Sequence, residues 1–181
     1  MANRWRMVAV LLLLLGIAAC GLLYLWFFRP PIEVAEMSIP KGYFPAGVDY
    51  HPMLSNRDSL PALDSGNQTV YWSGLNGLAT FNVERLPTFG WASKAFRFYE
   101  NLGSYPLYTD SLYRSSVADE FVTGCGTSEF GGFRCVSRAR YREYVATLNV
   151  VIDDEMTIEE FEQIVKYVDQ TFHNRLYDNA E

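Results

Sequence analysis

The stretch that decides the fold runs from Phe133 to Asp153 and reads FRCVSRARYREYVATLNVVID. Apolar or small side chains alternate with polar ones in both of its halves, which is typical of strands with two unlike faces. The parity of the alternation flips near residues 141–144, so one regular strand cannot continue through the stretch. A bulge or a turn has to lie there. Because no Gly, Asn or Pro is present for a tight turn, we expect a bulged long strand or an abrupt change of partner. The two alternating sets are Phe133, Cys135, Ser137, Ala139 and Tyr141, and then Tyr144, Ala146, Leu148, Val150 and Ile152.

The elements before this stretch are two strands, a helix and two further strand-like segments. TVYWSG (69–74) and LATFNVERL (78–86) flank Asn76-Gly77, a dipeptide that favours a tight hairpin because both residues tolerate positive φ. Residues 87–103 follow with helical spacing, and we expect the stripe Trp91, Ala95, Phe98 and Leu102 to face the core. Segments 105–113 and 117–125 are strand-like.

The last element is a helix from about Ile158 to about Tyr177. Thr157 and Glu160 have the spacing of a capping box, in which each side chain binds a backbone N–H of the first turn. The element order is therefore ββαβββ(β)α. It predicts an α+β fold with one antiparallel sheet and two packed helices. We assign residues 68–181 to this domain and residues 30–67 to a Pro-rich extended arm.

The first 29 residues form a predicted membrane anchor. Residues 7–28 carry no charge over 22 positions, and a helix of that length covers about 33 Å, enough to cross a bilayer. Arg4 and Arg6 precede the run and Arg29 alone follows directly, which favours a cytoplasmic N-terminus. We therefore expect a single-pass protein whose C-terminal domain lies on the periplasmic or extracellular side.

Cys20 keeps a second interpretation open. Ile17-Ala18-Ala19-Cys20 resembles the lipobox of bacterial lipoproteins, which implies cleavage and lipidation at Cys20. The chain then continues GLLYLWFF, which completes a membrane span and is unlike the polar tether of a mature lipoprotein. We expect Cys20 to be a residue of the span, with the lipoprotein and ordinary leader cleavage as the alternatives.

Cys125 and Cys135 bracket GTSEFGGF between two strand-like runs. In an oxidising compartment this spacing favours a disulfide that closes a loop or hairpin. Cys20 is not available to either of them if it lies in the membrane or is lipidated.

The charge of the domain bears on its partners. The whole chain carries a net charge of −6, and the part after Arg29 is more acidic still, so we expect no binding to nucleic acid. Two candidate interaction surfaces stand out: an aromatic one in the arm and a basic stripe in one strand. Their residues are Tyr43, Phe44 and Tyr50, and Arg134, Arg138, Arg140 and Arg142. The alternatives are an arm folded onto its own domain and a solvated sheet face paired with local acids.

Catalytic and metal-binding patterns are weak. His51, His173 and the acids at 153–160 form no recognisable motif, and no Cys-x-x-Cys or phosphate-binding glycine loop is present. We therefore expect no cofactor, no metal and no catalytic residues, with enzymatic activity left undecided. The function expected is a non-catalytic accessory subunit of a membrane complex, held to the bilayer by residues 7–28 and bound to a membrane protein. The alternatives are a tethered domain that binds a small molecule, lipid or glycan, and an unfamiliar hydrolase or transferase.

Overall fold

The computed structural model describes residues 13–18, 32–56, 61–72, 76–100, 112–127 and 132–177. The chain divides into two compact units, Met1–Pro31 and Ile32–Glu181. In the first unit, residues 13–18 are helical and exposed, and the rest of the predicted span, including Cys20, lies outside the described residues. Among the residues that are described, no helix is both long enough and apolar enough to cross a membrane.

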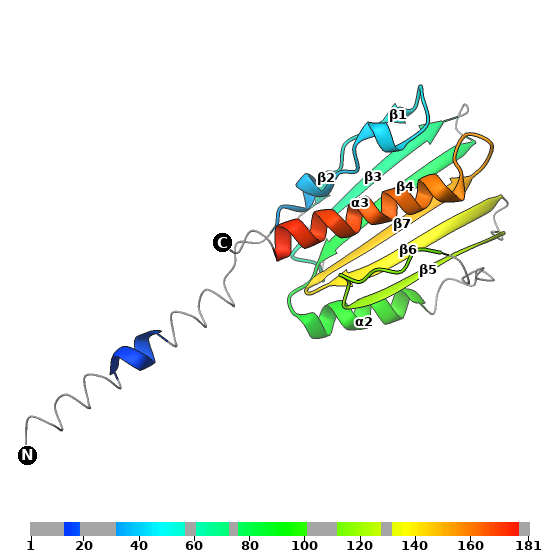
Figure 1. Ribbon diagram of the computed structural model, residues 1–181. Coiled ribbons are helices and arrows are strands. Elements are labelled where there is room, and N and C mark those ends of the chain that lie inside the picture. The colour runs from blue at the N-terminus through cyan, green and yellow to red at the C-terminus, as the bar shows by residue number, and fades with distance from the viewer. Residues whose placement is uncertain are drawn as a thin grey trace, which may run out of the picture. The chain divides into compact units, whose positions relative to one another are not determined.

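The second unit is built on one antiparallel sheet, which confirms the α+β class (Figure 1). Seven strands lie in the described part of this unit, in the order β1-β3-β4-β7-β6-β5, with β2 also paired to β3. The strands are β1 (Asp49–Tyr50), β2 (Leu54–Asn56), β3 (Asp64–Trp72), β4 (Gly77–Arg85), β5 (Glu120–Thr127), β6 (Phe133–Tyr141) and β7 (Tyr144–Ile152).

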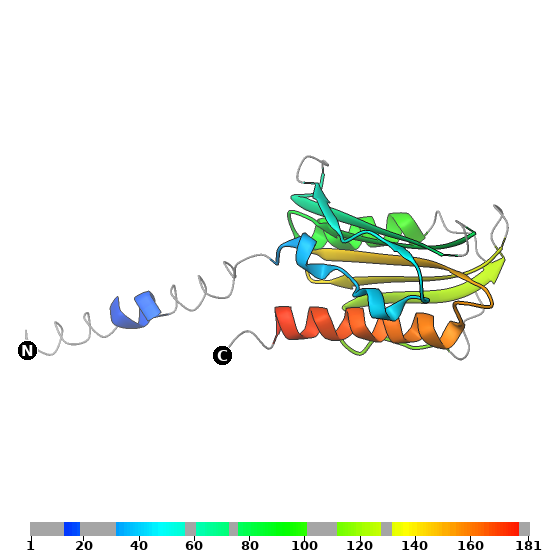
Figure 2. The same cartoon turned by 90° about the horizontal axis from the view of Figure 1, so that it is seen from above.

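Two helices cover opposite faces of this sheet (Figure 2). The long helix α3 (Ile158–Leu176) buries an apolar stripe against the face that carries the main core. The shorter helix α2 (Phe89–Glu100) packs on the other face, where Ala92 and Val145 belong to a second, smaller core. The predicted capping box is confirmed: Thr157 Oγ1 accepts from the backbone N–H of Glu160, and the Glu160 carboxylate accepts from that of Thr157.

The turn between β6 and β7 corrects our first prediction. Instead of one bulged strand, Arg142 and Glu143 form a two-residue turn, and Tyr141 pairs with Tyr144 across it. Arg142 takes a φ of +57°, a conformation that costs a non-glycine residue about 1–2 kcal/mol. Its backbone N–H donates to Asp119 Oδ2 at 2.6 Å, so a tertiary contact favours a turn that the local sequence does not.

Further contacts hold the same turn in place. The Arg142 carbonyl accepts from Arg140 Nη1 at 3.1 Å, and the Glu143 carbonyl accepts from the backbone N–H of Leu86 at 2.8 Å. The Arg142 guanidinium also lies 5.5 Å from the ring centre of Phe89. A two-residue turn reverses the parity of the alternation, so both apolar sets face α3, and this explains the pattern in the sequence.

The orientation of α2 is the second correction. The expected inward stripe includes Trp91 and Phe98, yet these side chains are 51% and 63% exposed. Ala92 and Phe96 are buried instead, and Ala95 packs beside them. Small side chains let the helix approach the sheet closely, and the larger rings are left on the solvent side.

The β3–β4 hairpin is confirmed, but Asn76-Gly77 is not its two-residue turn: Gly77 is the first residue of β4, pairs with Trp72 and does not take a positive φ. The strand predicted at 105–113 lies outside the described residues except for 112–113, which are not in a strand. The arm carries two short 3₁₀ helices, η1 (Val34–Met37) and η2 (Lys41–Tyr43), as well as β1 and β2. It lies on the α3 side of the sheet, where the buried Gln68 amide binds both backbone groups of Ile39, at 2.8 Å and 2.9 Å.

Candidate functional site

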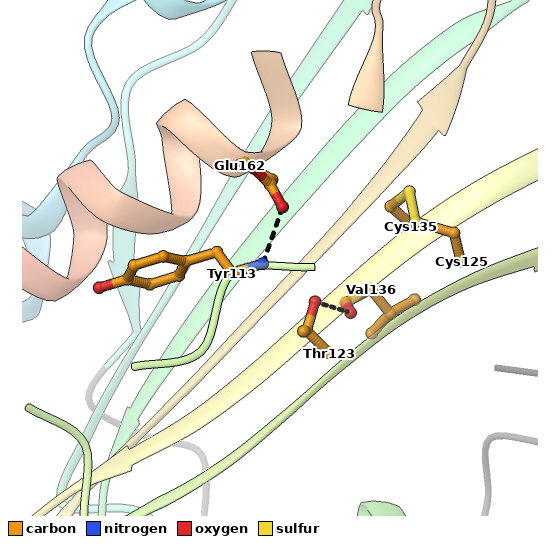
Figure 3. Close-up of a disulfide and its surroundings, with 6 residues drawn as sticks. All are labelled: Tyr113, Thr123, Cys125, Cys135, Val136 and Glu162. Carbon is orange, nitrogen blue, oxygen red and sulfur yellow. Dashed lines mark hydrogen bonds between the residues drawn. A yellow bond between two sulfur atoms is a disulfide. The ribbon is translucent and has the colours of Figure 1, made fainter. Parts of the chain in front are cut away.

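The predicted disulfide between Cys125 and Cys135 is confirmed, and it links the edge strand β5 to β6 (Figure 3). The two residues are direct partners in the ladder, with Cα atoms 4.0 Å apart, and both side chains are buried. Directly opposed residues lie this close only where the pair exchanges no backbone hydrogen bonds. The Cys125 N–H and C=O therefore point away from β6.

The same geometry fixes the direction of the whole β5 backbone. Phe121 and Thr123 share the parity of Cys125, so their backbone groups also point to the outer edge of the sheet. The β6–β7 turn leads to the same conclusion. Tyr141 and Tyr144 close a two-residue hairpin, so the backbone N–H and C=O groups of the odd-numbered β6 residues point toward β7. The odd-numbered residues of β5 lie opposite these residues, so their backbone groups find no partner on β6. Within the described residues β5 pairs with β6 alone, so the outward groups have no strand partner there.

A groove lies beside this outer edge. It has a volume of about 410 Å³ and is lined by Arg114, Ser115, Phe121, Val122 and Thr123. Residues Phe121 and Thr123 supply the outward backbone donors and acceptors. The Thr123 hydroxyl points the other way and donates to the carbonyl of Val136 at 3.1 Å (Figure 3).

Tyr113 fixes the segment that forms the other wall of the groove. Its backbone N–H donates to Glu162 Oε1 at 2.7 Å, as Figure 3 shows, and its hydroxyl donates to Asp169 Oδ2 at 2.7 Å. Its ring also meets that of Phe121 edge to face, with centres 6.2 Å apart. The wall is therefore attached to α3, and the groove is preformed.

Asp169 is a buried carboxylate that serves two phenols. It accepts from Tyr113 and from Tyr141, whose ring stacks on Phe172 with centres 4.1 Å apart. Burial, the hydrogen bond to Asp169 and the charge of that carboxylate raise the pKa of Tyr113 to about 12. Burial first, and then Asp169, raise the pKa of Tyr141 well above its usual value. Both phenols stay protonated at neutral pH and act as structural donors.

Arg114 gives the groove its charge. The residue is exposed, and it makes no ion pair in the part of the chain that is described. The next residue, Ser115, accepts from the backbone N–H groups of Val117 and Ala118, at 3.0 Å and 2.8 Å, which shapes the turn behind it. A guanidinium in this position can bind a carboxylate through two parallel hydrogen bonds.

The predicted basic stripe is split between two elements. Arg134, Arg138 and Arg140 share the α2 side of β6, whereas Arg142 lies in the turn rather than in the strand. Arg138 Nε donates to Thr147 Oγ1 at 3.3 Å. A docking role for the stripe stays a prediction.

Arg140 is neutralised inside the domain. It is paired with Asp119 at 2.9 Å and with Glu120 at 2.8 Å. Partial burial alone raises the pKa of Glu120, but hydrogen bonds from Ser93 and Arg140 and the charges of Arg140 and Arg97 outweigh it, and the pKa is lowered. These pairs match the alternative of a sheet face balanced by local acids.

The aromatic residues of the arm pack on their own domain. Phe44 is buried, and the Tyr43 ring lies on Tyr167 with centres 4.7 Å apart. The Tyr50 hydroxyl donates to the carbonyl of Ile39 at 3.0 Å. Only the exposed parts of the Tyr43 and Tyr50 side chains remain for contact with a partner. The proposed aromatic interaction surface of the arm therefore stays a prediction.

The catalytic candidates have structural partners. His51 lies 3.4 Å from Asp49, with both side chains exposed, and His173 lies beside Tyr177 in the last turn of α3. Asp153 accepts from the indole of Trp72 at 2.9 Å and closes the turn that leads into α3. No group of three or more metal-ligating side chains occurs among residues the structure describes.

Comparison with known proteins adds no relative: no protein-family model, no curated protein and no solved structure matches this chain. Sequence reasoning missed Arg114, Phe121 and Thr123. The available signal was the strand EFVTGCGT, which has no Lys or Pro of the kind that usually protects an exposed sheet edge.

Proposed function

We propose that this chain is a membrane-tethered, non-catalytic binding module that takes up an extended segment of a partner protein along β5. The observation that carries the proposal is the outer edge of β5, where the backbone groups of Phe121 and Thr123 point into a groove next to Arg114. Strand addition of this kind derives affinity from main-chain hydrogen bonds and specificity from neighbouring side chains. Arg114 favours a segment with a carboxylate at the matching position.

The disulfide supports both the compartment and the mechanism. Disulfides persist outside the reducing cytoplasm, which agrees with a domain on the outer side of a membrane and an anchor at residues 7–28. The same bond ties β5 to β6 at Cys125, two residues from Thr123. An edge that is already rigid loses less conformational entropy when a partner strand binds.

The test uses one backbone donor. Thr123→Pro removes an outward N–H without removing a backbone hydrogen bond between β5 and β6. Thr123→Val keeps the N–H and, like Thr123→Pro, loses the hydroxyl that donates to Val136, so it is the matched control for that loss. A photo-crosslinker at Val122 in the full chain, in its native membrane, is expected to give one protein adduct. Thr123→Pro and Arg114→Glu should abolish the adduct, and Thr123→Val should retain it. The same crosslinker at Leu54, which is 71% exposed at the opposite edge, is the control for random collisions.

Loss of the adduct in Thr123→Val as well as in Thr123→Pro would show that the side chain matters and the edge does not. An adduct that survives Thr123→Pro would contradict strand addition. Circular dichroism and the intact mass of the disulfide-bonded chain establish that each variant is folded.

A second candidate is a small-molecule ligand in the same groove. Its volume of about 410 Å³ lies in the range of ligand pockets, and Arg114 would suit an anionic ligand. The same variants separate the two functions, because a small anion bound by Arg114 should tolerate Thr123→Pro and fail with Arg114→Glu.

A further inference from the structure

The chain enters the domain at one defined end of the sheet. The backbone N–H of Ile32 donates to the Tyr144 hydroxyl at 2.9 Å, and this bond is buried. Tyr144 pairs with Arg85 on one side and Tyr141 on the other, and Arg85 pairs with Asp64. We call this row of four residues, with the loops beyond it, the tether end.

Large apolar side chains are exposed at the tether end. Leu63, Phe89 and Trp91 are 50%, 52% and 51% exposed. Leu63 is placed there by its backbone bond to the carbonyl of Arg85 at 2.7 Å, and Phe89 by the guanidinium of Arg142 in the β6–β7 turn. Trp91 lies on the same first turn of α2 as Phe89 and turns away from the sheet. All three side chains come from segments that border the tether end, where an apolar environment would cover them.

The length of the tether limits what can cover them. Three residues, Arg29–Pro31, separate the end of the apolar run at Phe28 from Ile32. Four extended steps of the chain cover at most about 14 Å. With residues 7–28 in the bilayer, Ile32 would therefore lie within about 14 Å of the end of the span.

We infer that the tether end lies on the bilayer and places Leu63, Phe89 and Trp91 in the headgroup region. This inference rests on the anchor at residues 7–28 that is part of the proposed function. Trp and other aromatic rings favour that region because it accepts both apolar and polar atoms. Arg142 Nε already lies 3.9 Å from Glu143 Oε2. We therefore expect the contact between the tether end and the membrane to be mainly apolar and to need no anionic lipid. The docked domain would present the β5 groove at a fixed height above the membrane.

The experiment measures depth in the full chain, made by cell-free synthesis into phosphatidylcholine nanodiscs. Nitroxide labels are attached singly through Leu63→Cys, Phe89→Cys and Trp91→Cys in a Cys20→Ala background, where Cys125 and Cys135 stay paired. Electron paramagnetic resonance then compares collisions with oxygen, which concentrates in lipid, and with a water-soluble nickel chelate. Phe133→Cys is the matched control, since Phe133 is 39% exposed at the other end of β6, roughly 26 Å from Tyr141.

A several-fold higher ratio of oxygen to nickel collisions at 63, 89 and 91 than at 133 is the expected result. Equal ratios at all four positions would overturn the inference. A label on native Cys20 separates this failure from failure of the anchor: a deep Cys20 label with a water-like Phe89 label overturns the docking alone. A water-like Cys20 label overturns the tether, and the docking with it.

Discussion

Removal of the Cys125–Cys135 bond should destabilise the domain by an amount that follows from the loop it closes. The two residues are 10 positions apart. The chain-entropy relation gives about 2.7 kcal/mol for a loop of that length at 25 °C. For a domain of about 150 residues, this corresponds to a fall in Tm of roughly 8 °C. The double variant Cys125→Ala/Cys135→Ala is the perturbation, because it leaves no free thiol.

Urea unfolding of the variant and of the wild type measures the difference, with Cys20→Ala as the control for cysteine loss elsewhere. The midpoint should fall while the slope stays unchanged, which marks a change in stability alone. Reduction of the wild type should lower the midpoint by a similar amount. A loss below about 1 kcal/mol by either route would refute the reasoning, because it would mean that β5 is constrained equally well without the bond.

Three further predictions concern the buried polar contacts. Stability should be complete below pH 10 and fall as the pH rises toward 12, because the pKa of Tyr113 is raised to about 12 in the fold and its ionisation breaks the bond to Asp169. The last phase of tyrosine ionisation in the absorbance at 295 nm should coincide with the change in circular dichroism, and complete ionisation without structural change would contradict this. Glu120→Gln should weaken the dependence of Tm on pH below 4.5. The pKa of Glu120 is lowered in the fold, so the stability that its charged form contributes is lost as the pH falls. Identical plots of Tm against pH for the variant and the wild type would count against the pairing with Arg140. Gln68→Ala should cost about 1–3 kcal/mol in urea unfolding, because the buried N–H of Ile39 loses its partner while the carbonyl keeps only the Tyr50 hydroxyl. The exposed Asn67→Ala should cost far less.

Local signals in the sequence predicted the elements that depend on neighbouring residues. The capping box at Thr157 and Glu160 predicted the start of α3. The strand-like runs on either side of Asn76-Gly77 predicted the β3–β4 hairpin, although that dipeptide is not its turn. The spacing of Cys125 and Cys135 gave the disulfide. Each of these features is decided within about ten residues, and this is the range over which sequence patterns are informative.

The features that were missed depend on distant partners. The Arg142 turn is stabilised by Asp119 and Phe89, which are 23 and 53 positions away, so its own residues carry no turn signal. The outward rotation of α2 follows from how closely Ala92 can approach Val145, which a helical period alone does not show. The groove at β5 needs the strand order, because only the order makes β5 an edge.

Residue-level hydrogen exchange along β5 tests the central claim most directly. The measurement compares the free full chain with the complex that co-purifies with it in mild detergent. Strand addition predicts slower exchange at the outward amides of Phe121, Thr123 and Cys125 and no change at Val122 and Gly124, which already bind β6. Protection with this period of two supports a partner strand on β5. Uniform protection across the five amides, or none at all, would contradict it.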